Sequence, residues 1–211
     1  MTASVATRRG SLVMALCIAL VIGWPFALHE IRDNDVYAVL GPYGAAVALL
    51  LLAVRGVRVD GRAVMRGAAI GVAVGVAMTA ATYAAYALLV AVVPGLAGHV
   101  ADLYAAAHSE RIGPALAWTC VVMCAEELLW RGALLETAEA RFGRPAAVAL
   151  SLATYTAVQI GSGSWVVALA AFVCGAIWTA ERVWTRTLWA ALVSHAIWTV
   201  TVIHLLPVTG R

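Results

Sequence analysis

Apolar residues along this chain are grouped into long runs that short polar segments separate. We place seven such runs at about 11–28, 36–54, 64–94, 115–136, 146–160, 165–180 and 187–206. A helix needs about 20 residues to cross the hydrocarbon core of a bilayer, so the fifth and sixth runs are short and the third is long enough to tilt or to turn near Pro94. The pattern predicts an all-α, polytopic membrane helix bundle of about seven transmembrane helices.

Composition agrees with a membrane protein. The chain is 64% hydrophobic and only 12% charged, with a mean hydropathy of +0.92, whereas a soluble domain carries about 25% charged residues. We find no soluble domain and no internal repeat, so we expect a single integral membrane domain over 1–211, with N-terminal helices at about 11–94 and motif-bearing helices at about 115–206. The net charge of +3 is small and spread between loops, so the expected partner is the lipid bilayer and not nucleic acid.

Arginines distinguish the two sides of the predicted bundle. One set of loops and helix ends holds Arg8, Arg9, Arg55, Arg58, Arg62, Arg66, Arg141, Arg144, Arg182 and Arg186. The opposite loops hold only Arg32, Arg111 and Arg211. The positive-inside rule then predicts a bacterial-type inner (plasma) membrane protein with a cytoplasmic N-terminus and an outer C-terminus. The first run follows two arginines as in a signal peptide, but a retained helix is expected because no small-residue cleavage site is convincing.

Tryptophans and one polar segment mark the predicted helix boundaries. The tryptophans assigned to the two membrane surfaces are Trp24, Trp118 and Trp165 outside, and Trp178, Trp184 and Trp189 inside. The polar segment Pro94–Gly113 is interpreted as the longest outer loop. It contains His99 and His108, for which a metal role is not expected.

Small residues recur at four-residue spacing in the third run, at Gly67, Gly71, Gly75 and Thr79. Such a stripe lets a second helix approach closely. The simpler interpretation is packing within the chain, and a dimer interface is the alternative.

Three charged residues interrupt the apolar run at 115–135, namely Glu126, Glu127 and Arg131. Each costs about 2.5–3.5 kcal/mol at the centre of a membrane helix on insertion scales, so they must face polar groups or each other. Glu127 and Arg131, four residues apart, share a helix face and can form an ion pair. Glu126 points about 100° away and is left as the unpaired carboxylate. A packing salt bridge with one glutamate protonated is the alternative interpretation.

Polar residues also occur at helical spacing in two later runs. The fifth run contains Tyr155 and, one turn on, Gln159, and the seventh contains Ser194, His195 and, one turn beyond His195, Thr199. A single such residue in a membrane helix usually makes a helix–helix hydrogen bond. Because an unpaired carboxylate needs polar neighbours, we expect Gln159 and His195 to lie near the glutamate pair, in the outer half of the membrane.

At this point the residues resemble a known family. Glu126-Glu127-Leu128-Leu129-Trp130-Arg131, followed by the turn Arg141-Phe142-Gly143-Arg144-Pro145, is similar to the first motif of the CAAX-protease and bacteriocin-processing (CPBP or Abi) family. Thr187-Leu188-Trp189-Ala190-Ala191 before His195 is similar to the family's last motif. The resemblance covers about residues 115–205. It implies an all-helical intramembrane protease with a catalytic glutamate and neither metal nor other cofactor.

Two positions depart from the family pattern. The middle motif Phe-x-x-x-His is matched by Tyr155-Thr156-Ala157-Val158-Gln159, and the last motif His-x-x-x-Asn by His195-Ala196-Ile197-Trp198-Thr199. Glutamine can hydrogen-bond a water but cannot take up a proton. The chain is therefore either a working variant or a catalytically inactive relative that acts as a membrane binding or scaffolding protein.

The function predicted from these residues is metal-independent intramembrane hydrolysis of a peptide bond. Glu126 is assigned as the general base for a water held with help from Gln159. His195 and Thr199 are assigned to bind the carbonyl oxygen as it becomes an oxyanion, a large electrostatic contribution in acyl transfer.

The other members of the first motif and the substrate complete this prediction. Glu127 and Arg131 are assigned to fix the helix and to tune the base. The resemblance implies a peptide or protein substrate with a membrane-associated segment: a prenylated C-terminus, a leader, or a C-terminal sorting tail of the myxosortase type. An outward site favours an exported substrate. The sequence lacks the His-Glu-x-x-His motif that would indicate a metalloprotease. It also lacks the inverted repeat that would indicate a transporter.

Overall fold

The computed structural model describes residues 2–30, 35–55, 61–109 and 111–209, and these form helices with no strand among them. The helices are α1 Thr2–Glu30, α2 Val36–Arg55, α3 Gly61–Val92, α4 Leu96–Ala107, α5 Ile112–Glu126, the π-helical η1 Glu127–Leu134, α6 Leu135–Phe142, α7 Arg144–Gln159, the 3₁₀ turn η2 Ile160–Ser162, α8 Trp165–Thr185, α9 Leu188–Thr199 and the π-helical η3 Val200–Leu205. Three arginines used to orient the chain, Arg32, Arg58 and Arg211, lie outside the described residues.

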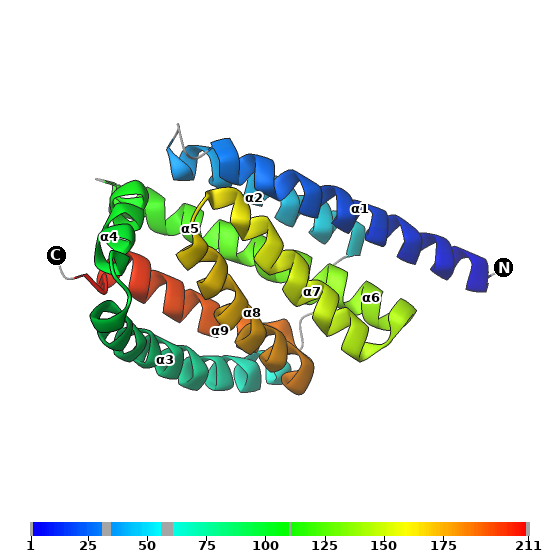
Figure 1. Ribbon diagram of the computed structural model, residues 1–211. Helices are drawn as coiled ribbons and strands as arrows, with labels where there is room; N and C mark the ends of the chain where they lie inside the picture. Colours follow the sequence, from blue (N-terminus) through cyan, green and yellow to red (C-terminus); the bar gives the residue numbers. More distant parts are fainter. Residues whose placement is uncertain (1, 31–34, 56–60, 110, 210–211) are drawn as a thin grey trace.

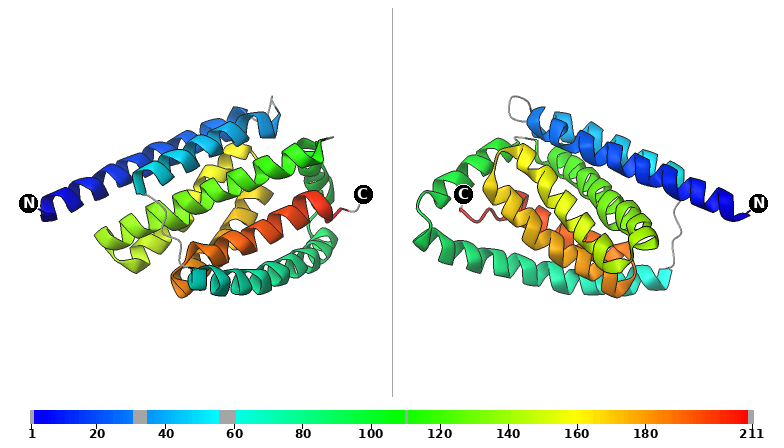
Figure 2. Two further views of the ribbon diagram at one scale, coloured as in Figure 1. Left: turned by 180° about the vertical axis from the view of Figure 1, so that it is seen from behind. Right: turned by 45° about the vertical axis from the view of Figure 1, so that its right-hand side comes forward.

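One continuous helix made of α5, η1 and α6 runs through the middle of the bundle (Figure 1). The antiparallel pair α1 and α2 packs along one side of it, and α9, backed by α3, lies on the other side (Figure 2). The hairpin of α7 and α8 closes a third side. Chemistry placed on the middle helix is therefore surrounded by helices from the rest of the chain.

Within the described ranges, six helical segments are long and apolar enough to cross a membrane. They cover 10–30, 36–54, 61–92, 112–142, 165–185 and 188–205. The predicted sixth run extends further than expected, to Thr185, and reaches 21 residues. The predicted fifth run became α7, whose 16 residues continue directly into the 3₁₀ turn η2. The protein is thus an integral membrane helix bundle, with α7 as a short helix packed against α6 and α8.

The glycine stripe of α3 packs within the chain, as predicted. A Cβ added to Gly71 would lie 2.5 Å from the carbonyl oxygen of Ala190 and 2.8 Å from the Val193 Cβ, both on α9. Added Cβ atoms at Gly67 and Gly75 would also meet α9 or its N-cap. The stripe therefore brings the backbones of α3 and α9 into close contact.

Two boundary predictions were wrong. The segment after Pro94 is not a loop but contains α4, and Gly95 takes the left-handed conformation (φ 76°) that turns the chain between α3 and α4. Trp24 and Trp178 do not lie in aromatic belts, because each is 1% exposed. Both rings fill the protein core instead, where Trp24 packs edge-on against Trp130.

Candidate active site

The middle helix changes its winding at the glutamate pair. The α-helix ends at Glu126 and the π-helical segment begins at Glu127. Wider π-turns inside α-helices occur often at functional sites. Nearly every residue of this segment is buried, and the Ser151 hydroxyl of α7 donates to the carbonyl oxygen of Trp130 at 3.0 Å. Neighbouring helices therefore hold the segment on all sides.

Glu127 and Arg131 form the predicted ion pair. The Arg131 Nη1 lies 3.1 Å from the Glu127 Oε1, and both side chains are fully buried. Removing one partner of such a pair would leave an uncompensated buried charge. The guanidinium is further held by α8, since it donates to the Thr179 hydroxyl at 3.4 Å and to the Gly175 carbonyl oxygen at 3.3 Å.

Aromatic rings surround the Arg131 guanidinium. Its central carbon lies 4.2 Å from the centroid of the Tyr155 ring and 5.4 Å from that of Trp178. Such cation–π contacts are stronger where water is excluded. Gly175 makes room for this arrangement, because a Cβ there would lie 2.8 Å from the Tyr155 ring and 3.0 Å from the Arg131 Nη2.

Glu126 has no arginine partner and lies on a different face, as predicted. Its Oε2 accepts a hydrogen bond from the Tyr155 hydroxyl at 3.1 Å, and its Oε1 accepts one from the Gln159 Nε2 at 3.3 Å. Both donors come from one face of α7. The carboxylate is 7% exposed and is thus held in place by two neutral donors.

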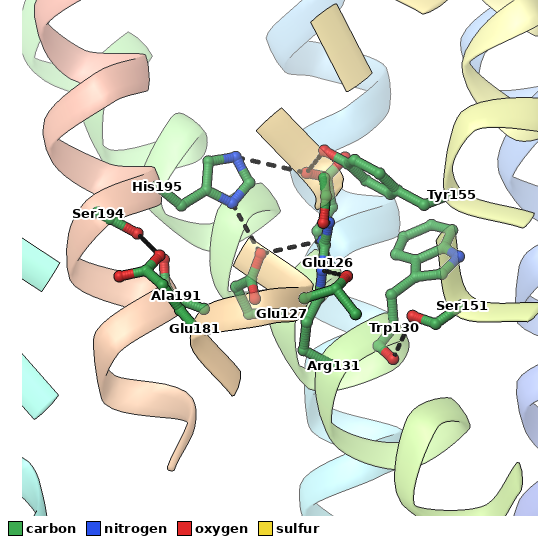
Figure 3. Close-up of polar contacts among 12 residues, drawn as sticks. Glu126, Glu127, Trp130, Arg131, Ser151, Tyr155, Glu181, Ala191, Ser194 and His195 are labelled. Atoms are coloured by element: carbon green, nitrogen blue, oxygen red, sulfur yellow. Dashed lines mark hydrogen bonds and ion pairs between the residues drawn. The ribbon is translucent and has the colours of Figure 1, made fainter. Parts of the chain in front are cut away.

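His195 of α9 lies between the two glutamates (Figure 3). Its Nδ1 is 3.0 Å from the Glu127 Oε1, and its Nε2 is 3.7 Å from the Glu126 Oε2. Because Glu127 is ion-paired with Arg131 and can only accept, we assign the Nδ1 proton to the bond with Glu127. The second nitrogen, Nε2, then faces Glu126.

Two residues of α8 support His195. The Trp178 ring stacks on the imidazole, with centroids 3.6 Å apart and planes 19° apart. One turn further along α8, the buried Glu181 accepts a hydrogen bond of 2.5 Å from Ser194, the residue before His195 (Figure 3). The α8 helix therefore holds both the arginine and the histidine of the site.

The structure brings together five of the six residues singled out from the sequence. These are Glu126, Glu127, Arg131, Gln159 and His195. The sixth, Thr199, ends α9 one turn after His195. Its hydroxyl oxygen is buried and has no hydrogen-bond partner within the described part of the chain.

Sequence reasoning missed the contribution of α8. Trp178 was assigned to a membrane surface, and neither Thr179 nor Glu181 was considered. A buried carboxylate beside a membrane segment, as at Glu181, was an available signal. Tyr155 was noted as a polar residue one turn before Gln159 and as a motif position but was given no role. Its hydroxyl, absent from the phenylalanine of the family pattern, donates to Glu126.

A cavity lies next to the end of α7 that carries Gln159. A space of about 440 Å³ is lined by Ile160, Gly163, Ser164, Trp165 and Ala168, directly after Gln159 in the chain. His99 of α4 reaches the same place, where its Nε2 lies 3.0 Å from the Ser164 hydroxyl oxygen. Across the described ranges, no group of three or more His, Cys, Asp or Glu side chains has a metal-binding arrangement.

Comparison with known proteins assigns the family. Residues 108–201 match the family model described as type II CAAX prenyl endopeptidase Rce1-like. This part of the chain is similar to the CAAX protease family. The match covers less than half of the chain but includes all six residues predicted for the site. The chain has no match among curated proteins or among solved structures.

The family match indicates the general class of the site. The matching family is one of CAAX-type endopeptidases, which are hydrolases acting on peptide or protein substrates. The first part of the match contains the glutamate pair and the last part contains His195, which the structure brings into contact.

Proposed function

We propose that this protein is a metal-independent intramembrane endopeptidase in which Glu126 is the general base. The observation that carries the proposal is the different pairing of the two adjacent glutamates. Arg131 neutralises Glu127, whereas Glu126 meets only neutral donors and His195. Glu126 is thus the carboxylate left free to take a proton from a water, whose oxygen then attacks the scissile carbonyl carbon.

Glu127 and Arg131 act through His195 in this proposal. The Glu127 carboxylate accepts from Nδ1 and so directs Nε2 toward Glu126. When Nε2 carries a proton, His195 can donate it in a hydrogen bond to the developing oxyanion. Oxyanion stabilisation of this type is usually the largest electrostatic contribution to acyl transfer. Collapse of the tetrahedral intermediate then moves the proton from Glu126 to the leaving amine.

Gln159 and Thr199 are proposed as the polar groups that complete the site. Gln159 donates to Glu126 and is placed to orient the water that Glu126 activates. The Thr199 hydroxyl, buried and without a partner among the described residues, is available to donate to the substrate carbonyl alongside His195.

The proposed substrate is a membrane-associated peptide or C-terminal tail that approaches from the outer surface. The cavity after Gln159 lies at that end of the site under the proposed orientation, with the N-terminus cytoplasmic and the C-terminus outside a bacterial-type inner membrane. An outer approach favours an exported sorting tail of the myxosortase type over a cytosolic prenylated protein.

The test compares processing of membrane proteins in cells that carry wild-type protein or Glu126→Gln. Glutamine keeps the shape of the side chain but cannot act as a base, so we expect normal folded yield and a loss of cleavage of at least about 10²-fold. Glu136→Gln, on the same middle helix and partly exposed, is the matched control and should cleave normally. Purified protein should cleave equally with and without a chelator.

The alternative is a catalytically inactive relative that binds membrane proteins without cutting them. One observation favours it: an amide, which cannot take up a proton, stands at Gln159 where the family pattern has histidine. Suppose that cells with wild type and cells with Glu126→Gln contain the same fragments, and that both proteins capture the same partners. The scaffolding function is then correct and the proposed peptidase activity is wrong.

A further inference from the structure

A second cavity lies away from the glutamate site, on the side of the bundle formed by α1. It is a groove of about 570 Å³ between α1, α6 and α7, and it includes the end of η1. One face of α1 lines it, through Met14, Ala15, Ile18 and Val21. Among the lining residues Ile18 is 51% and Phe142 is 59% exposed, so the groove is open to the surroundings of the bundle.

The groove runs along the helices for the depth of one lipid leaflet. From Ser11 to Val21 the face of α1 advances ten residues, or about 15 Å at 1.5 Å per residue. The hydrocarbon core of a bilayer is about 30 Å thick, so this length is half of it. The α7 helix spans the same depth, because Thr154, which lines the deep end of the groove, lies ten residues beyond Arg144 at the start of that helix. The dimensions therefore match one acyl chain and not a segment that crosses the membrane.

The shallow end of the groove holds an arginine that has no ion-pair partner among the described residues. Arg141 lines the groove there, next to Phe142 at the end of α6. The neighbouring arginines at this end have carboxylate partners: Arg144 and Arg186 share Glu139, and Arg182 pairs with Glu136. No ion pair or hydrogen bond among the described residues includes the Arg141 guanidinium. A free guanidinium at headgroup depth matches the geometry and charge of a phosphate.

We propose that this groove is a binding site for an anionic phospholipid, which inserts one acyl chain along α1 and places its headgroup phosphate on Arg141. The apolar lining accounts for the chain and Arg141 accounts for the preference for a negative headgroup. This site is separate from the glutamates, because the groove is lined by the opposite face of α7, at Leu150 and Thr154, from the one that holds Tyr155 and Gln159.

Native mass spectrometry of the full chain in detergent tests the proposal, with phosphatidylglycerol or phosphatidylcholine added at equal concentration. Wild type should retain one copy of phosphatidylglycerol in preference to phosphatidylcholine. Arg141→Gln should weaken phosphatidylglycerol retention by about fivefold, which corresponds to the roughly 1 kcal/mol expected for one arginine near an anionic headgroup. Ala15→Phe, which fills the groove from the α1 side, should abolish retention of both lipids.

Arg144→Gln is the matched control. It removes an arginine at the same end of the bundle, but one already paired with Glu139, so lipid retention should stay at the wild-type level. Elution on size exclusion and melting temperature report whether each variant is folded. If Ala15→Phe fails to fold, Ile18→Trp blocks the same groove from an exposed position.

Two results would overturn the proposal. One is equal retention of both lipids by wild type, and the other is unchanged phosphatidylglycerol retention in folded Arg141→Gln. A third result would also contradict the proposal: wild type retains no lipid, and Ala15→Phe loses substrate cleavage. The groove would then be assigned to substrate binding. The lipid measurement requires no cleavage assay, so its outcome is independent of the proposed peptidase activity.

Discussion

At the scale of single residues, the two adjacent glutamates differ because of their neighbours. Both side chains are buried in one helix, but Glu127 faces Arg131 and Glu126 faces Tyr155 and Gln159. A buried carboxylate next to a guanidinium is stabilised as an anion. A carboxylate that is held by neutral donors can more readily take up and release a proton. Identical chemical groups thus acquire a structural and a proposed catalytic function.

The stacking of Trp178 on His195 leads to a prediction. Phenylalanine at position 178 keeps an aromatic ring in the core but offers a smaller surface to the imidazole, so the imidazole should turn away from Glu126. We expect kcat to fall by about tenfold to a hundredfold with little change in KM, since small misplacements of reacting groups have effects of this size. Steady-state cleavage by purified Trp178→Phe protein measures both constants.

A double-mutant cycle separates positioning from general stability. If Trp178 acts through His195, then Trp178→Phe should cause no further loss of kcat in a His195→Gln background. Trp184→Phe is the control, because that ring lies on the same helix and is 73% exposed. Losses of kcat that simply add in the double variant would show that Trp178 supports the fold and not the histidine.

At the scale of helices, the site depends on close approaches that small residues permit. The α8 helix lies against Arg131 and Tyr155 at Gly175, and α3 lies against α9 along its glycine stripe. Membrane helices associate by van der Waals packing of this type, since lipid chains provide no hydrophobic force between them. The α3 stripe therefore fixes the position of α9, the helix that holds His195.

The stripe predicts opposite effects for two glycine-to-alanine changes. At Gly71 the new Cβ would lie 2.5 Å from a backbone oxygen of α9, so overpacking should lower the free energy of unfolding by about 1–3 kcal/mol. At Gly98 in α4 nothing lies within 4 Å of the added Cβ. Alanine there should be neutral or stabilise the helix by up to about 1 kcal/mol. Thermal melts of the two detergent-solubilised variants provide the comparison, and equal melting temperatures would contradict the close packing.

At the scale of the whole molecule, charged side chains gather at one end of the bundle. The end of α6, the start of α7 and the end of α8 meet there through ion pairs of Glu136 and Glu139 with three arginines. The apolar surfaces of α1, α3 and α8 outside this region suit contact with lipid. The same end carries most of the arginine excess from which the sequence predicts the cytoplasmic side.

This charge asymmetry predicts the orientation of the protein in a bacterial inner membrane. An alkaline phosphatase fused to the C-terminus should be active, because that enzyme folds only outside the cytoplasm, and a fluorescent protein fused to the N-terminus should fluoresce. A fluorescent protein at the C-terminus is the reciprocal control and should stay dark. The reverse pattern would place the cavity after Gln159 on the cytoplasmic side and would favour a cytosolic substrate.

The sequence by itself determined the class, the orientation prediction and the local chemistry of this protein. Apolar runs of membrane length and scarce charge predict a helix bundle, because an unpaired backbone cannot exist in lipid. The ion pair of Glu127 with Arg131 was also predictable, since it joins residues four apart on one helix. Polar residues at helical spacing indicated Gln159 and His195 as neighbours of the glutamate pair, and the family resemblance added their motif positions.

Only the tertiary structure decided how the site is assembled. Tyr155 reaches Glu126 across 29 positions and His195 reaches Glu127 across 68, so these contacts depend on how whole helices pack and rotate. Periodicity indicates which face of a helix a residue lies on but not what packs against that face, which is why Trp178 was assigned to the membrane surface. The groove beside Arg141 likewise exists only where α1, α6 and α7 meet, because no single helix encloses a space.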